Sequence, residues 1–246
     1  MKRLNGVVAV VTGGNGGIGE ATCRRLALEG ACLGIGYLEE KKKAVALAEE
    51  LSAAGQKCIA VYGDVCDQTS VNTMMEAVRS ALGPITVLVN NAGIARHTPF
   101  MNITESEWTE VINTNLSGAF RCIKSVLDDM LAAGHGCVVN ISSELALTGG
   151  DERAHYVASK SGIIGLTMSL AREFGPRNIR VNAIAPGPTD TRMLGETGRA
   201  EKYVQGLPLR RIGRPDEIAA AVAFMCSPDA GYCTGQVLSP NGGAVI

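Results

Sequence analysis

The chain has 246 residues, 46% of them hydrophobic, and its 23 basic residues are balanced by 24 acidic residues. A chain of this length can bury a large apolar core without the help of disulfides or metal ions. The even charge balance and the lack of a basic cluster exclude a nucleic-acid partner and a polybasic membrane anchor.

Short apolar segments alternate with longer helical patterns along the chain. The predicted strands are Val7–Val11, Cys32–Gly36, Cys58–Tyr62, Thr86–Val89, Cys137–Ile141, Arg180–Ala185 and Gln236–Ser239. The predicted helices are Glu20–Glu29, Lys42–Ala54, Ser70–Leu82, Glu105–Ala132, His155–Phe174 and Asp216–Cys226. The strands are apolar without alternation, which is typical of parallel strands with helices on both faces. The pattern predicts an α/β fold with a single domain over residues 1–246 and a doubly wound, parallel, seven-stranded sheet. An eight-fold barrel is the alternative, but it would need an eighth strand.

The first predicted strand runs into a glycine-rich segment, Thr12–Gly19, that precedes the first helix. Side chains at its glycines would keep the backbone from approaching a pyrophosphate, and the helix presents free N–H groups to phosphates. This placement predicts a dinucleotide-binding loop, with a ligand-free tight turn as the alternative. The residues predicted to bind the cofactor here are Gly13, Asn15, Gly16, Gly17, Ile18 and Gly19.

The end of the second predicted strand bears on the choice of cofactor. Proteins that bind NAD usually carry an acidic residue there, ~20 residues after the glycines. Tyr37 occupies that place, and Glu39 lies further into the loop. No arginine stands at Leu38 or Gly16 to bind a 2′-phosphate, and Lys41–Lys43 would reach it only if the loop folds back. We favour NADP(H), with NAD(H) as the alternative.

Three other strand ends carry turn-like segments. Asp64 and Val65 close the third strand, where a short polar side chain can bind the adenine edge or simply cap a turn. The segments Asn90–Gly93 and Pro186–Gly187 follow later strands and, on their own, indicate turns.

A candidate catalytic group begins the helix His155–Phe174. Tyr156 and Lys160 are four residues apart, so they project from one face of the helix. A phenol, with an ordinary pKa of ~10, is a poor acid or base at neutral pH, but a nearby ammonium group stabilises the phenolate. The pair can then exchange a proton with a carbonyl or alcohol oxygen while a hydride moves. Ser143, after the strand Cys137–Ile141, can hold the substrate oxygen; packing or a surface role is the alternative for such a pair.

Together these motifs resemble the short-chain dehydrogenase/reductase family over essentially the whole chain, with a general texture similar to 3-oxoacyl carrier-protein reductases. The matching segments, in chain order, are Thr12–Gly19, Asp64–Val65, Asn90–Gly93, Asn115, Ser143, Tyr156 with Lys160, and Pro186–Gly187 leading to Thr191.

The resemblance implies a Rossmann-like fold, a homotetramer and a role for every matching segment. Asn115 would join Ser143, Tyr156 and Lys160 as a catalytic residue, by supporting a water that links Lys160 to solvent. Further cofactor contacts are implied for Tyr37, Asp64, Val65, Asn91, Ala92, Gly93, Tyr156, Lys160, Pro186, Gly187, Thr189 and Thr191.

The predicted activity is NAD(P)-dependent hydride transfer between a nicotinamide and a ketone or secondary alcohol. Reduction of a 3-oxoacyl thioester is one candidate; oxidation of a sugar, polyol or cyclic alcohol is an alternative, and a non-catalytic dinucleotide-binding regulator is another. The small-molecule substrate is expected to meet a loop at about residues 187–207. Glu144, Leu145 and Asp151 either face the same pocket or lie on the surface.

The eight cysteines form no Cys-x-x-Cys motif, so we predict free thiols and no metal site in a reducing compartment. No apolar run reaches the ~20 residues of a membrane span, and Val7–Val11 is too short for a signal-peptide core. We expect a cytoplasmic protein without a membrane partner.

Overall fold

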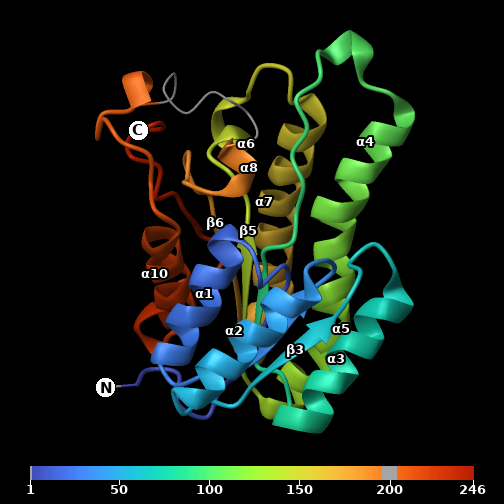
Figure 1. The fold of residues 1–246 in the computed structure, drawn as a ribbon, viewed down its shortest axis with the longest axis vertical. Coiled ribbons are helices and arrows are strands. Elements are labelled where there is room, and N and C mark those ends of the chain that lie inside the picture. The colour runs from blue at the N-terminus through green and yellow to red at the C-terminus, as the bar shows by residue number, and fades with distance from the viewer. Residues whose placement is uncertain (1, 196–203) are drawn as a thin grey trace.

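The computed structural model describes residues 2–195 and 204–246 (Figure 1). Seven strands form one sheet in the order β3-β2-β1-β4-β5-β6-β7, and every neighbouring pair is parallel. Their bounds are β1 Val8–Val11, β2 Cys32–Tyr37, β3 Cys58–Tyr62, β4 Val87–Asn90, β5 Gly136–Ile141, β6 Ile179–Ile184 and β7 Val237–Leu238. The predicted doubly wound parallel sheet is confirmed.

Helices cover both faces of the sheet (Figure 1). Apolar residues of α1 (Gly17–Leu28), α2 (Lys41–Ala53) and α10 (Pro215–Cys226) pack on one face. Those of α3 (Gln68–Leu82), α5 (Gly118–Ala133) and α7 (Ala154–Phe174) pack on the other. Side chains alternate along a strand, so Ala9 and Val11 of β1 enter the first layer while Val8 and Val10 enter the second. Burial on both faces explains why the strands are continuously apolar.

The predicted helix Glu105–Ala132 is wrong in one respect, because the structure interrupts it. Helix α4 (Glu105–Ile112) and helix α5 are joined by a π-helical segment, Asn113–Ser117. There the backbone N–H of Gly118 donates to the carbonyl of Asn113, five residues earlier. Such π segments insert an extra residue into a helix and occur often at functional sites. A periodicity of 3.6 residues does not reveal a local change of this kind.

The smaller elements complete the chain. They are the short helices α6 (Leu145–Thr148) and α8 (Arg192–Gly195) and the 3-10 turns Phe100–Asn102, Gly175–Arg177 and Pro228–Ala230. The last predicted strand is shorter than expected, because only Val237 and Leu238 pair with β6 at the edge of the sheet.

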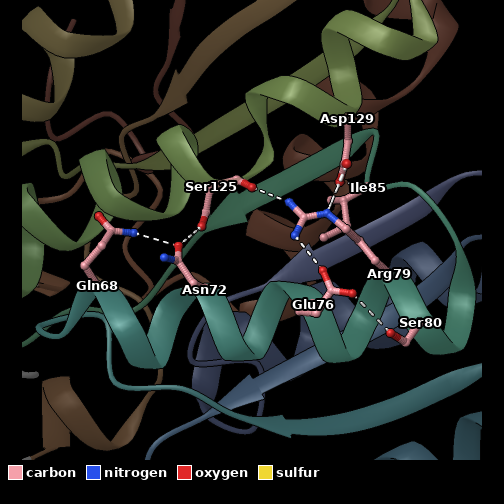
Figure 2. A network of polar contacts seen from close by, with 8 residues as sticks. All are labelled: Gln68, Asn72, Glu76, Arg79, Ser80, Ile85, Ser125 and Asp129. Atoms are coloured by element: carbon pink, nitrogen blue, oxygen red, sulfur yellow. Dashed lines mark hydrogen bonds and ion pairs between the residues drawn. The ribbon is translucent and has the colours of Figure 1, made fainter.

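A polar network joins α3 to α5 (Figure 2). Arg79 Nε donates to both carboxylate oxygens of Asp129 at 3.0 and 2.7 Å, and Asp129 also accepts the backbone N–H of Ile85 at 3.2 Å. The Arg79 guanidinium also donates to the carbonyl of Ser125. Since Ile85 precedes β4, this network lies near the amino edge of the sheet, away from the strand ends considered next.

The order of the strands reverses beside β1, which has β2 on one side and β4 on the other. In open α/β sheets, ligands bind outside the carboxyl ends of the strands at such a reversal point. The glycine-rich segment that follows β1 and the turn that follows β4 meet there.

All eight cysteines are free thiols, and five of them are buried, as their apolar sequence context predicts. Within residues 2–195 and 204–246, no cluster of His, Cys, Asp or Glu could hold a metal ion. In the same residues, no helix is both long enough and apolar enough to cross a lipid bilayer.

Candidate active site

The glycine-rich loop combines one closed position with one open position. A Cβ atom on Gly19 would lie 2.1 Å from the carbonyl oxygen of Gly13 and 2.6 Å from Asn91 Nδ2, so only glycine fits. A Cβ atom on Gly16 would meet no heavy atom within 4 Å. Gly16 immediately precedes α1, whose first N–H groups have no partner in the preceding turn of the helix. The loop therefore leaves space beside a helix N-terminus, which fits a bound pyrophosphate.

Hydrogen bonds connect this loop to the turn after β4. Thr12 Oγ1 accepts the backbone N–H groups of Asn91 and Ala92, each at 3.0 Å. The side-chain amide of Asn91 donates to the carbonyls of Thr12 and Gly13, each at 3.0 Å. Four hydrogen bonds thus join the two segments that carry predicted cofactor residues.

The end of β2 is also linked to the loop. Asn15 Nδ2 donates to the carbonyl of Glu39 at 2.8 Å, and Tyr37 packs edge-on against Tyr62 with ring centroids 6.0 Å apart. Lys43 forms an ion pair with Glu20 of α1 at 3.1 Å. Lys41 and Lys42 are the first two residues of α2 and are exposed.

Asp64 closes β3 by capping a turn. Its carboxylate accepts the backbone N–H of Cys66 at 2.8 Å, and its own N–H donates to Ser70 Oγ at 2.9 Å. Val65 packs against Gly118, where a Cβ atom would lie 2.8 Å from Val65 Cγ2. The turn-capping interpretation accounts for these contacts; an adenine contact stays a prediction.

Tyr156 and Lys160 lie together on the first turns of α7, both buried. Lys160 Nζ is 5.8 Å from the centroid of the Tyr156 ring and donates to the carbonyl of Ile141, the last residue of β5, at 2.8 Å. Burial lowers the pKa of the Lys160 ammonium from 10.5 to about 8. Below that pH, a positive charge stands beside the phenol at the carboxyl end of the sheet.

Asn115 occupies the π-helical segment and reaches the same place. Its Nδ2 donates to the carbonyl of Ile94 at 2.9 Å and to Ser159 Oγ at 3.0 Å, and its Oδ1 accepts the Ile94 N–H at 2.8 Å. A Cβ atom on Gly93 would lie 3.1 Å from Asn115 Oδ1 and 3.3 Å from Lys160 Nζ. Gly93 therefore permits Asn115 and Lys160 to approach each other.

Ser143 follows β5, and its hydroxyl forms hydrogen bonds with the next two residues, Glu144 and Leu145. Its hydroxyl donates to Glu144 Oε2 at 2.8 Å and accepts the backbone N–H of Leu145 at 3.2 Å. The backbone N–H of Glu144 donates in turn to the carbonyl of Pro186 at 3.0 Å. This last bond joins the end of β5 to the segment that follows β6.

A cavity of about 430 Å³ is lined by Glu144, the residue that follows Ser143. Its lining residues include Glu144, Leu145, Thr148, Asp151, Arg153 and Leu207. Glu144 and Arg153 are only 8% and 9% exposed. Burial raises the pKa of the Glu144 carboxyl, while the Ser143 hydroxyl, two backbone N–H groups and the charge of Arg153 oppose that rise. Glu144, Leu145 and Asp151, for which the sequence allowed a pocket or the surface, all line this cavity; Glu144 is buried and Asp151 is exposed.

Arg153 was missed by the sequence analysis. It is the residue immediately before α7, and its Nε donates to His97 Nδ1 at 3.3 Å. The only signal in the sequence was its position three residues before Tyr156. Since arginines are common on surfaces, that position alone does not indicate a buried site residue.

The segment after β6 meets the glycine-rich loop. A Cβ atom on Gly17 would lie 2.9 Å from Thr191 Cγ2, and one on Gly187 would lie 2.6 Å from Asn241 Cα. Thr189 Oγ1 donates to the carbonyl of Gly187 at 2.9 Å. The predicted substrate loop at about 187–207 is described in part; residues 196–203 lie outside the described residues.

Known proteins resemble this chain over nearly its full length. A family model described as enoyl-(acyl carrier protein) reductase matches residues 13–245. The 3-oxoacyl-[acyl-carrier-protein] reductase FabG of Staphylococcus aureus is 42% identical over 237 residues, 96% of each chain. The protein of that name from Escherichia coli is 41% identical over 244 residues, 98% of each chain. A solved dehydrogenase/reductase from Sinorhizobium meliloti superposes with a TM-score of 0.95 at 35% identity, covering 100% of this chain and 97% of its own.

Proposed function

The chain belongs to the short-chain dehydrogenase/reductase family and is an NAD(P)-dependent oxidoreductase of ketones and secondary alcohols, and we propose which of its residues carry that chemistry. The proposed catalytic residues are Asn115, Ser143, Tyr156 and Lys160. The observation that supports them is the meeting of Tyr156, Lys160 and the end of β5, with Lys160 bonded to Ile141 and 5.8 Å from the phenol ring.

The residues present fit a dinucleotide, because Gly16 faces open space at the N-terminus of α1. When bound, the cofactor supplies or accepts the hydride. Ser143 holds the reacting oxygen of the substrate, and Tyr156 donates a proton to it during reduction. The Lys160 ammonium stabilises the phenolate left on Tyr156. Asn115 fixes Ile94 and Ser159 around Lys160, and we propose that it also supports the water that returns a proton to this lysine.

We favour NADP(H) as the cofactor. The ribose end of the site has Tyr37 where an acidic residue would repel a 2′-phosphate, and Lys41 and Lys42 begin the helix that follows. Lys43 is engaged with Glu20, so it is the least suited of the three lysines to bind the phosphate.

Two substrate classes are proposed. The first is a 3-oxoacyl thioester, because the relatives from S. aureus and E. coli are 3-oxoacyl-[acyl-carrier-protein] reductases. A sugar or polyol is the second, and the buried charges of Glu144 and Arg153 beside Ser143 favour it. A non-catalytic regulator would have no use for this buried group of side chains.

The test is an assay of NADPH and NADH oxidation with ketones, sugars and acyl thioesters. The Tyr156→Phe variant should bind cofactor normally and lose roughly 10²- to 10⁴-fold in kcat, because it retains the ring and lacks the acid. A rate near that of the wild type would contradict the role of Tyr156. Binding of a dinucleotide without turnover of any carbonyl compound would favour the regulator.

We propose a homotetramer in the cytoplasm. Phe120 of α5 and Met168 of α7 are 51% and 47% exposed, which supports packing of these helices across one interface. The exposed C-terminal Ile246 suits a second interface. Light scattering should give four times the monomer mass, and a clean monomer would contradict the proposal.

A further inference from the structure

The hydroxyl group of Ser143 is already occupied by partners within the protein. It donates its one proton to Glu144 Oε2 at 2.8 Å and accepts the Leu145 N–H at 3.2 Å. To donate to a substrate carbonyl, Ser143 must therefore leave Glu144. Leaving Glu144 breaks a hydrogen bond inside a buried site, where no water replaces it. Another donor has to replace Ser143 at the Glu144 carboxyl group.

We propose that the substrate brings this donor: Glu144 selects ketones that carry a hydroxyl group on the carbon next to the carbonyl, and vicinal diols in the reverse direction. The inference rests on the proposed function, because it takes Ser143 to hold the reacting oxygen. On binding, the substrate hydroxyl donates to Glu144 Oε2 in place of Ser143. The Ser143 proton then turns to the carbonyl oxygen. The number of hydrogen bonds is conserved, and no buried group is left without a partner.

The spacing of the oxygens suits this exchange. The carbonyl and hydroxyl oxygens of an α-hydroxy ketone are separated by about one hydrogen-bond length, ~2.8 Å. Ser143 Oγ and Glu144 Oε2 are separated by 2.8 Å. The two pairs of oxygens can therefore face each other, with the carbonyl opposite Ser143 and the hydroxyl opposite Glu144. Glu144 is a specificity-determining residue in this arrangement, because it touches the substrate without touching the reacting carbon.

The surroundings of Glu144 are unsuited to an alkyl group in the same place. An alkyl neighbour would cover a carboxyl group that is 8% exposed and leave it without the donor that Ser143 had supplied. Sites built around a substrate hydroxyl discriminate strongly against analogues that lack it, for this reason. Arg153 and Thr148 also line the adjoining cavity, and both carry polar side chains that suit further oxygen atoms on the substrate.

The experiment compares two ketones of equal size, 1-hydroxy-2-butanone and 3-pentanone, which differ by a hydroxyl in place of a methyl group. With the preferred cofactor, kcat/KM of the wild type should be at least about 100-fold higher for the hydroxy ketone. Glu144→Leu should reduce this ratio to less than about tenfold, chiefly by lowering kcat/KM for the hydroxy ketone. Glu144→Gln retains an acceptor oxygen and should retain most of the preference. Glu173→Gln, which changes an exposed carboxylate far along α7, should leave the ratio unchanged.

A purely structural role for Glu144 would lower both activities equally, so the ratio separates specificity from damage to the fold. Equal wild-type activity on the two ketones, or an unchanged ratio in Glu144→Leu, would overturn the inference. So would reduction of 3-oxoacyl thioesters without reduction of the hydroxy ketone, although the proposed function would then stand. Failure to oxidise NADPH or NADH with any carbonyl compound would instead refute the proposed function itself.

Discussion

The two halves of the sheet prepare their ligand sites by different means. Around β1, β2 and β3, the loops are positioned mainly by backbone groups and neutral amides, and glycines set the available space. The buried carboxylate of this half, Glu29, lies at the far end of α1 and is paired with Arg3 and Arg25. This half therefore contributes mainly the shape of the space around a ligand.

The half built on β5, β6 and α7 instead places titratable groups at the strand ends. Lys160, Glu144 and Arg153 are all at most 9% exposed. Burying charged groups is costly, so natural proteins retain them chiefly where they are paired or used in chemistry. The comparison teaches what substitutions in each half should change. In the first half they should alter the space for a ligand and the stability of the fold, and in the second half they should alter charge and the pH dependence of stability and activity.

The largest expected effect tests the role of space in the first half. Gly19→Ala places a methyl group 2.1 Å from the carbonyl oxygen of Gly13, so we expect a loss of at least about 3 kcal/mol in the free energy of unfolding, or roughly 6–12 °C in Tm. The matched control is Gly16→Ala, where the backbone is extended and the methyl group meets nothing. That variant should keep the wild-type Tm and bind NADPH at least about tenfold more weakly. Thermal melts and cofactor titrations measure both; equal Tm values for the two variants would contradict the geometry.

The second prediction concerns charge at Lys160. The pKa of the Lys160 ammonium falls from 10.5 in the unfolded chain to about 8 in the folded protein. This difference corresponds to about 3 kcal/mol of stability, which the folded protein loses at neutral pH by burying the charged group. Above pH 8 the unfolded chain holds more protons than the folded one, so this cost is relieved as the pH rises from about 8 to 10.5. Lys160→Met removes the buried charge, which should stabilise the folded protein, and also the bond to Ile141, whose loss should offset part of that gain. The Tm of this variant should therefore exceed the wild-type value by roughly 4–8 °C at pH 7.

The same variant links stability to activity. Its advantage in Tm should shrink at pH 10, and its rate should fall with the pH profile displaced to higher pH, because the phenolate has lost its cation. A Tm difference that does not vary with pH would show that Lys160 is not buried as an ammonium ion. An unchanged rate profile would count against stabilisation of the phenolate.

The smallest expected effect concerns the amino edge of the sheet, which lies away from the ligand sites of both halves. Asp129→Asn weakens the bonds from Arg79 and Ile85 drawn in Figure 2 and should cost about 1–2 kcal/mol of stability, while kcat/KM stays within twofold. Glu76 is exposed and forms a 3.4 Å ion pair with the same arginine, Arg79. Glu76→Gln should therefore lower the free energy of unfolding by less than about 0.5 kcal/mol. A large fall in activity for Asp129→Asn would show that this edge is coupled to the site.

The sequence predicted the parts of the molecule that depend on local pattern. The strands were predicted to within one residue at each end, because apolar runs bounded by glycine or polar residues have few alternatives in a covered parallel sheet. Tyr156 and Lys160 were brought together by helical spacing alone. The sequence did not predict the π-helical segment or the burial of Arg153, and it left Glu144 undecided between pocket and surface. These depend on how separate elements meet, and a charged residue beside a strand end has the same local pattern whether it is buried or exposed.

The π-helical segment has a consequence for how this chain can change over time. One α-helical residue turns the chain by about 100°. Deleting a single residue between Asn113 and Ser117 would restore a regular helix, but it would swing α4 around its axis and withdraw the Asn115 amide from Ile94 and Ser159. Restoring regularity here would disassemble the surroundings of the lysine. Selection should therefore tolerate many exchanges of amino-acid type along this helix while rejecting changes in its length.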